Sequence, residues 1–333
     1  MEEFKWEDRI PSARELRGGF ENADDILSRI MGSGSSSIGS DLLRDTLLAK
    51  SVNSRRIKRS DATRIVSVTN QKGGVGKTTT TVNVATSFAA EGIPVLVIDL
   101  DPQANTSSSL GVRQMGKGIY EVMTGQASMQ EVVRKSPIFP SLEVVPSSID
   151  LSAIELEMAG EPQREAVLKK CLFSYLEGSG KKYEYVFIDC APSLGLLVLN
   201  ALTASREVLI PVQVEYYALE GLNQLLRTIN LVRLNFNPDL KNVMMILNMV
   251  DRRTILSRKI CETVREAYPS LVLSSSIPRL VRVAEAAAAG ESLTSFDPSS
   301  PAAVAYRQAC IEGYHEEQRE PRRNRTIDSC NYS

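Results

Sequence analysis

Seven short apolar runs dominate the hydrophobic pattern of this chain. Each run is rich in Val, Ile and Leu and carries few polar residues. That pattern is typical of strands that a parallel sheet buries on both faces. The strands predicted from these runs are residues 64–69, 95–99, 142–146, 185–189, 207–212, 243–249 and 271–277.

Stretches with helical character separate these runs, notably residues 79–90, 220–234, 255–267 and 302–317. A regular alternation of strands and helices favours βαβ units, whose crossovers are right-handed. We therefore expect an α/β fold, with a doubly wound and mostly parallel sheet flanked by helices. Ligands of such sheets bind at the carboxyl ends of the strands, so the residues that follow each strand are the first candidates for a site.

Composition changes on either side of this alternating region and divides the chain into three parts. Residues 1–61 include the stretch GSGSSSIGS, and we expect a partly disordered extension with short helices at residues 23–31 and 41–50. Residues 62–318 form the predicted globular domain. The polar residues 319–333 are predicted to form a disordered tail.

Charge and cysteine content narrow the possible classes of function. The chain carries 39 Lys and Arg against 40 Asp and Glu, a formal net charge of −1, so any contact with nucleic acid must come from a local basic patch. The basic residues from Arg55 to Arg59 supply such a patch or form a solvated linker, and the sequence leaves both open. The five cysteines form no C-x-x-C pair, and the chain contains a single histidine, so a zinc site is disfavoured. This pattern favours free thiols in a reducing cytoplasm.

The sharpest chemical signal is KGGVGKTT, which follows the first predicted strand and precedes a predicted helix. It is a variant of the phosphate-binding motif G-x-x-x-x-G-K-[ST], in which glycines let successive backbone N–H groups point at phosphate oxygens. Lys77 is expected to reach the β- and γ-phosphates of a nucleotide, and the hydroxyl of Thr78 to bind Mg²⁺. The predicted nucleotide-binding residues of this loop are Lys72, Gly73, Gly74, Val75, Gly76, Lys77, Thr78 and Thr79.

Acidic residues end two further predicted strands. Asp189 closes the apolar run YVFID, a Walker B pattern, and is expected to hold Mg²⁺ through water. Asp99 and Asp101 point to the same side of their strand because side chains alternate with a period of two. One of them would hold water on the metal and the other would orient the attacking water. Either of them alternatively only caps the next helix.

The presence of two lysines in the loop, Lys72 and Lys77, is the mark of the deviant Walker A motif, and KGGVGKTT resembles the ParA/MinD family of P-loop NTPases. DLDPQ at residues 99–103 and PVQVEYYALEGL at residues 211–222 resemble the ParA/Soj-type partitioning ATPases in particular. The resemblance covers about residues 64–306, most of the chain.

This resemblance implies roles for individual residues. Lys72 crosses a dimer interface to the phosphates of the other subunit, Asp101 positions the hydrolytic water, and Asp99 lies near the metal. The residues implied to hold adenine are Asn248, Pro278 and Arg279, and those implied to contact DNA are Arg253 and Arg282. One departure from the family pattern is Glu291, which replaces a usual lysine and predicts either weaker DNA binding or an altered partner surface.

The resemblance implies a switch ATPase of slow turnover that uses ATP and Mg²⁺ and forms a homodimer on ATP binding. It would bind double-stranded DNA non-specifically and drive chromosome or plasmid segregation with a ParB/Spo0J-like partner. We expect a cytoplasmic, nucleoid-associated protein without membrane contact.

Three alternatives stay open to different degrees. An orphan ParA-like ATPase would position another cellular cargo, and the sequence does not exclude it. A MinD-like membrane-associated ATPase needs an amphipathic carboxy-terminal helix, which residues 325–333 do not provide. An iron–sulfur electron carrier needs cysteines placed to bridge a cluster between subunits, and the scattered cysteines disfavour it.

Overall fold

The computed structural model describes residues 37–113, 116–215 and 218–313, and these fall into two compact units that divide between Arg56 and Ile57. The first unit contains one described helix, α2 (Ser37–Asn53), which includes the expected helix at residues 41–50. The expected helix at residues 23–31 and the expected tail lie outside the described residues.

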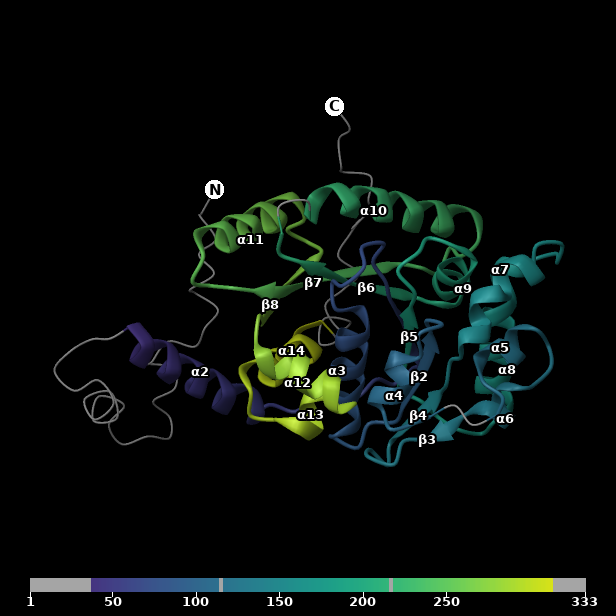
Figure 1. Cartoon of the computed structure of the whole chain (residues 1–333), viewed down its shortest axis with the longest axis horizontal. Helices are drawn as coiled ribbons and strands as arrows, with labels where there is room; N and C mark the ends of the chain where they lie inside the picture. The colour runs from purple at the N-terminus through teal and green to yellow at the C-terminus, as the bar shows by residue number, and fades with distance from the viewer. Residues whose placement is uncertain (1–36, 114–115, 216–217, 314–333) are drawn as a thin grey trace. The chain divides into compact units, whose positions relative to one another are not determined.

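The second unit is built on an eight-stranded sheet of order β3-β4-β2-β5-β1-β6-β7-β8 (Figure 1). All neighbouring strands are parallel except β3 and β4, which pair antiparallel. The strands are β1 (Arg64–Val68), β2 (Val95–Leu100), β3 (Arg134–Lys135), β4 (Leu142–Val145), β5 (Tyr185–Cys190), β6 (Glu207–Gln213), β7 (Asn242–Val250) and β8 (Val272–Pro278).

All seven strands predicted from the apolar runs are present, with their ends displaced by at most one residue. Strand β3 was not predicted, because two charged residues at the edge of a sheet carry no apolar signal. It pairs with Glu143 and Val144 of β4 and closes that edge of the sheet.

Helices cover both faces of the sheet (Figure 1). One face carries α3 (Lys77–Ala89), α12 (Val281–Ala289), α13 (Leu293–Phe296) and α14 (Pro301–Gly313). The opposite face carries α5 (Ile119–Met123), α6 (Met129–Val132), α7 (Ile154–Glu157), α8 (Val167–Gly178), α9 (Leu196–Ala204), α10 (Ala218–Asn235) and α11 (Ile255–Ala267). The remaining elements are α4 (Asn105–Ser109), which follows β2, and the 3₁₀ turns η3 (Ile149–Ala153) and η4 (Arg164–Ala166).

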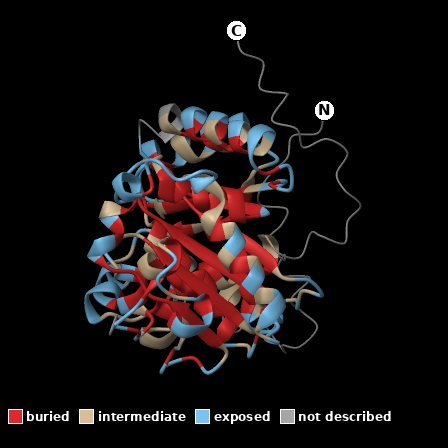
Figure 2. Cartoon of the chain, turned by 90° about the vertical axis from the view of Figure 1, so that its right-hand side faces the viewer, coloured by how far each residue is buried: buried red, intermediate tan, exposed pale blue. Residues whose placement is uncertain are grey.

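Alternation along each strand divides the apolar side chains between these two helical layers. Ile65 and Val186 join a core that includes Leu197 of α9. Tyr185, which precedes Val186 in β5, instead stacks on Phe88 of α3, and the two ring centroids lie 4.1 Å apart. Figure 2 shows the result as a buried sheet between helices whose outer faces are exposed. The prediction of a doubly wound, mostly parallel sheet is confirmed.

Among the described residues, no helix combines the length and the apolar character that crossing a bilayer requires.

Candidate functional site

The phosphate loop connects β1, in the middle of the sheet, to α3. Its conformation depends on two glycines, because Gly74 has a φ of 75° and Gly76 a φ of 89°, a left-handed region that disfavours other residues. A Cβ atom added at Gly73 or Gly74 would meet no atom within 4 Å, so this part of the loop borders open space. Val75, by contrast, is buried and fixes the loop to the domain.

Gly76→Ala is expected to lower the free energy of unfolding by at least about 1 kcal/mol, because a Cβ there combines a left-handed φ with a close contact. That Cβ would lie 2.9 Å from Nδ2 of Asn248. Urea unfolding of the nucleotide-free protein measures the change. Gly73→Ala is the matched control, since its Cβ meets nothing within 4 Å, and equal stability of the two variants would contradict the strain argument.

Lys77 opens α3 and points back across the loop. Its side chain is buried, and its Nζ donates to the backbone oxygen of Lys72 at 3.1 Å. Burial lowers the pKa of the Lys77 ammonium from its ordinary value, while Asp189, Cys190 and Asp101 act in the opposite direction. The loop therefore curls around a buried cation that forms no ion pair with a carboxylate among the residues that the structure describes, and a bound anion would supply such a partner.

Two asparagines brace the loop against the neighbouring strands. Asn70 donates from Nδ2 to the oxygen of Pro211 on β6 at 2.7 Å and accepts from the backbone N–H of Lys72 at 3.0 Å. Asn248 of β7 donates from Nδ2 to the oxygen of Val75 at 3.0 Å. The Oδ1 of Asn248 is buried and accepts no hydrogen bond within the described residues. The amide of Asn248 thus has one free acceptor next to the loop, and its contact with adenine stays a prediction.

Asp189 lies at the carboxyl end of β5 among three hydroxyl groups. Its Oδ2 accepts from Thr78 at 2.9 Å and from Thr106 at 2.6 Å, and its Oδ1 accepts from Thr81 at 3.0 Å. Burial raises the pKa of Asp189, and the three hydroxyl groups oppose that shift. The structure therefore brings together Thr78 and Asp189, two of the three residues that the sequence predicted at the magnesium site, the third being Asp99.

Asp99 and Asp101 have different surroundings although they end the same strand region. Asp99 is fully buried next to Asp189 in the strand register, and its Oδ2 accepts from the backbone N–H and the hydroxyl of Ser107 at 2.8 and 2.6 Å. Burial and then the charge of Asp189 raise the pKa of Asp99. Asp101 is partly exposed and accepts from the N–H of Gln103 at 3.0 Å. Asp101 is thus the carboxylate of this pair with access to solvent.

Lys72 stands at the exposed head of the loop. Its Nζ forms an ion pair with Oε2 of Glu215 at 2.6 Å, and the side chains are 44% and 48% exposed. The other oxygen of Glu215 accepts from Gln213 at the end of β6. The lysine that defines the deviant motif is therefore held inside its own protomer.

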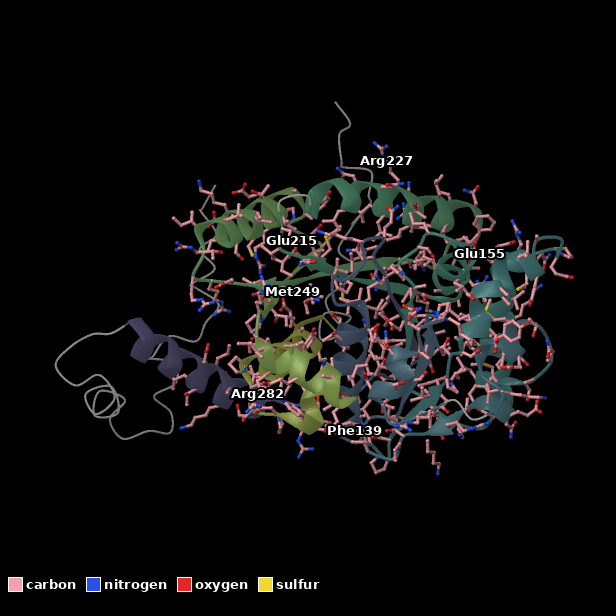
Figure 3. All side chains as sticks on the ribbon, in the orientation of Figure 1. Phe139, Glu155, Glu215, Arg227, Met249 and Arg282 are labelled. Carbon is pink, nitrogen blue, oxygen red and sulfur yellow. The ribbon has the colours of Figure 1, made fainter. Side chains whose placement is uncertain are left out.

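The remaining predicted site residues follow β7 and β8. Arg253 is paired with Asp251 through two hydrogen bonds of 2.9 and 3.0 Å, and its side chain is 87% exposed. Arg282 of α12 (labelled in Figure 3) pairs with Glu285 at 2.9 Å. Pro278 ends β8, and the exposed Arg279 follows it.

Four residues of this site escaped the sequence analysis: Asn70, Thr81, Thr106 and Ser107. Thr81 lies one helical turn after Thr78, so a helical projection of α3 would have found it. Thr106 and Ser107 depend on how α4 folds back over the ends of β2 and β5, and no local pattern reveals that.

The residues present suit a nucleoside triphosphate with magnesium. Backbone N–H groups and the positive end of α3 surround an open cradle at Gly73 and Gly74. The hydroxyl of Thr78 and the carboxylate of Asp189 are hard oxygen donors, the kind that Mg²⁺ prefers. The charge of Asp189 acts on the buried ammonium of Lys77, which would balance phosphate charge.

Comparison with known proteins is consistent with this geometry. A family model described as an AAA domain matches residues 63–242. The sporulation initiation inhibitor protein Soj of Bacillus subtilis is 42% identical over 245 residues, which cover 73% of this chain and 95% of Soj. The chromosome partitioning protein ParA of Myxococcus xanthus is 41% identical over 245 residues, covering 73% of this chain and 85% of that protein.

Among solved structures, cobyrinic acid a,c-diamide synthase from Mycobacterium smegmatis is 35% identical, with a TM-score of 0.64. It was solved with ADP and magnesium, where 74% of this chain and 92% of that chain are covered, and with an ATP analogue and magnesium. The strand order, the deviant phosphate loop and this degree of identity lead to one conclusion. The chain belongs to the Soj/ParA family of chromosome-partitioning ATPases.

Proposed function

We propose that this protein binds ATP with Mg²⁺ in the phosphate loop and hydrolyses it slowly as a molecular switch. The observation that carries this proposal is the contact of Thr78 with Asp189 beside the buried ammonium of Lys77. When bound, the metal would neutralise charge on the β- and γ-phosphates. Thr78 and Asp189 would hold it, and Lys77 would bind the phosphate oxygens.

Asp101 is the candidate for placing the attacking water. It is partly exposed, lies next to the buried Asp99 and starts the turn that leads into α4. Transfer of a phosphoryl group to water depends mainly on positioning and charge neutralisation, and no cysteine or histidine is needed. A carboxylate in this place would orient the attacking water.

Dimerisation would follow from the loop itself. Lys72 is exposed, and it would reach the phosphates of a second protomer once both carry ATP. The two triphosphates would supply the negative charge that binds Lys72 of each protomer at the interface. The nucleotide would then decide whether the dimer exists.

DNA is the proposed track of this switch. Arg253 and Arg282 are exposed and lie on segments that follow β7 and β8. These segments are at the carboxyl ends of the parallel strands, as is the nucleotide site. A few arginines on each protomer would bind backbone phosphates without reading sequence, and binding would fall steeply with salt. By similarity to its relatives, the protein would act in chromosome segregation with a ParB/Spo0J-like stimulator on the nucleoid.

Retention on DNA tests the proposed function as a whole. The purified protein is passed over immobilised double-stranded DNA with Mg-ATP, with Mg-ADP and with no nucleotide, across a salt series. Of these three conditions, only Mg-ATP is expected to give retention. The retained fraction is expected to fall as the salt concentration rises. Equal retention in all three conditions would contradict a nucleotide switch, and no retention at low salt would favour a cargo system without DNA.

Replacing Arg253 and Arg282 by alanine is expected to abolish this retention and to preserve the ATP-dependent dimer. Each lost phosphate contact should reduce the slope of log affinity against log salt by about 0.9. Fluorescence anisotropy with labelled DNA measures affinity, and light scattering measures the dimer. Asp251→Asn is the opposed variant, because it releases Arg253 from its ion pair and should tighten binding. Unchanged DNA affinity of the double variant would move attention to the basic residues from Arg55 to Arg59.

A further inference from the structure

We propose that Glu215 is a positioning residue that retains Lys72 within its own protomer until two ATP-bound protomers meet. This inference rests on the proposed function, since it assigns a regulator to the same loop. It adds a residue, Glu215, that gives the free protomer a competing partner for the lysine. Release of that partner then becomes part of forming the dimer.

The ion pair is direct and has a fixed base. Nζ of Lys72 lies 2.6 Å from Oε2 of Glu215, and Gln213 donates to the other carboxylate oxygen. The backbone around Glu215 is anchored, because Val214 donates to the oxygen of Asn248 at 3.2 Å and Glu215 donates to the oxygen of Gln213 at 2.9 Å. The carboxylate, labelled in Figure 3, is therefore held at the carboxyl ends of β6 and β7.

The backbone of Lys72 is anchored, as that of Glu215 is, whereas its side chain is held by the ion pair with Glu215. Its N–H donates to Asn70 at 3.0 Å, and its oxygen accepts from Nζ of Lys77 at 3.1 Å. Its side chain is 44% exposed and has Glu215 as its carboxylate partner. A change of partner thus requires only rotation about the side-chain bonds of Lys72, while the loop that binds phosphate keeps its shape.

The charges involved determine that the ion pair between Lys72 and Glu215 favours the free protomer over the dimer. The free protomer holds two lysines in one loop, and Glu215 neutralises the exposed one. In the dimer, phosphate oxygens replace the carboxylate, so each protomer exchanges one ion pair for another. An exposed pair of this kind shifts an equilibrium by up to about fivefold, and two pairs are broken per dimer, so the combined effect reaches up to about 25-fold.

The first arm of the test asks whether the pair exists in the free protomer. The nucleotide-free protein is treated briefly with an amine-acylating reagent, and modification of Lys72 is followed by mass spectrometry. Glu215→Gln is expected to raise the rate at Lys72 by about two- to fivefold, since the lysine loses its partner. Lys241, which forms an ion pair with Asp239 at 3.8 Å, is the internal reference. Its modification rate should not change. An unchanged rate at Lys72 would overturn the proposal.

The second arm measures the consequence for assembly. In an Asp101→Ala background, which blocks hydrolysis, the dissociation constant of the Mg-ATP dimer is determined by analytical ultracentrifugation. Adding Glu215→Gln is expected to tighten the dimer by about 3- to 25-fold. Asp239→Asn, which removes an exposed carboxylate from another surface pair, is the matched control and should leave the constant unchanged.

The outcomes separate the two ideas. If the Asp101→Ala parent stays monomeric with Mg-ATP, the proposed switch fails, whatever happens at Lys72. If the parent dimerises and Glu215→Gln has an equal or weaker dimer, the switch survives and the retaining role of Glu215 is refuted. A weaker dimer would mean that Glu215 supports the interface.

Discussion

Lys77→Ala is expected to abolish ATP binding and, with it, the formation of the dimer. The ammonium of Lys77 is buried under the loop and donates to the oxygen of Lys72, so it stands where phosphate oxygens would accept. Charge-assisted hydrogen bonds contribute about 1.5–3 kcal/mol each, and an ammonium that binds two phosphates should account for a loss of at least about 100-fold in affinity. Isothermal titration calorimetry with Mg-ATP measures the loss.

The same substitution should leave the nucleotide-free fold intact or slightly stabilised. Burial lowers the pKa of Lys77, which means that the empty protein bears a desolvated cation at a cost. Thermal unfolding without nucleotide is therefore the companion measurement. Lys241→Ala, at a side chain that is 74% exposed, serves as the control for loss of a lysine. Wild-type affinity for ATP in the Lys77→Ala protein would remove the basis for every functional proposal made above.

Asp101→Ala is expected to reduce ATP hydrolysis by roughly 100-fold or more and to accumulate the ATP-bound dimer. A side chain that orients or deprotonates a nucleophile typically contributes a factor of about 10²–10⁴. Binding should be retained, because Thr78, Asp189 and Lys77 are untouched. Release of phosphate measures turnover, and light scattering measures the dimer.

The contrast with Asp99 makes this prediction specific. Asp99 is fully buried, and its carboxylate accepts hydrogen bonds from Ser107 and from the N–H of Asp101. Its replacement by alanine should mainly destabilise the fold near α4, while Asp101→Ala should unfold like wild type. Asp61→Ala, at an exposed residue of the same unit, controls for loss of a carboxylate. Wild-type turnover in Asp101→Ala would assign the water to another group.

The sequence predicts the sheet well because a strand covered on both faces must be almost wholly apolar. Strand β5, for example, is buried at every position from Tyr185 to Cys190. The phosphate loop is predictable for a similar local reason, since its glycines, lysine and threonine are consecutive. Strand β3 was missed because Arg134 and Lys135 owe their pairing to β4 and not to their own character.

The rest of the site depends on contacts between distant segments. Thr106 reaches Asp189 across 83 positions, and Lys72 meets Glu215 across 143. Such pairs follow from the order of strands in the sheet, which the alternation of strands and helices does not specify. Without that order, a polar residue after one strand is indistinguishable from any other polar loop residue. The roles proposed for Asp101, Asn248 and the arginines stay predictions until they are measured.

The hydrogen bond from Asn248 to Val75 joins the phosphate loop to the strand that ends just before Arg253. Between them, Met249 (labelled in Figure 3) has a φ of 58°, and the pairing of β7 with β8 is irregular there. A non-glycine residue in that region stores backbone strain. Asn248 and Arg253 are five positions apart, so the contact with the phosphate loop and the arginine turn lie on one short segment of the chain. We expect occupancy of one surface to be felt at the other without rearrangement of the sheet.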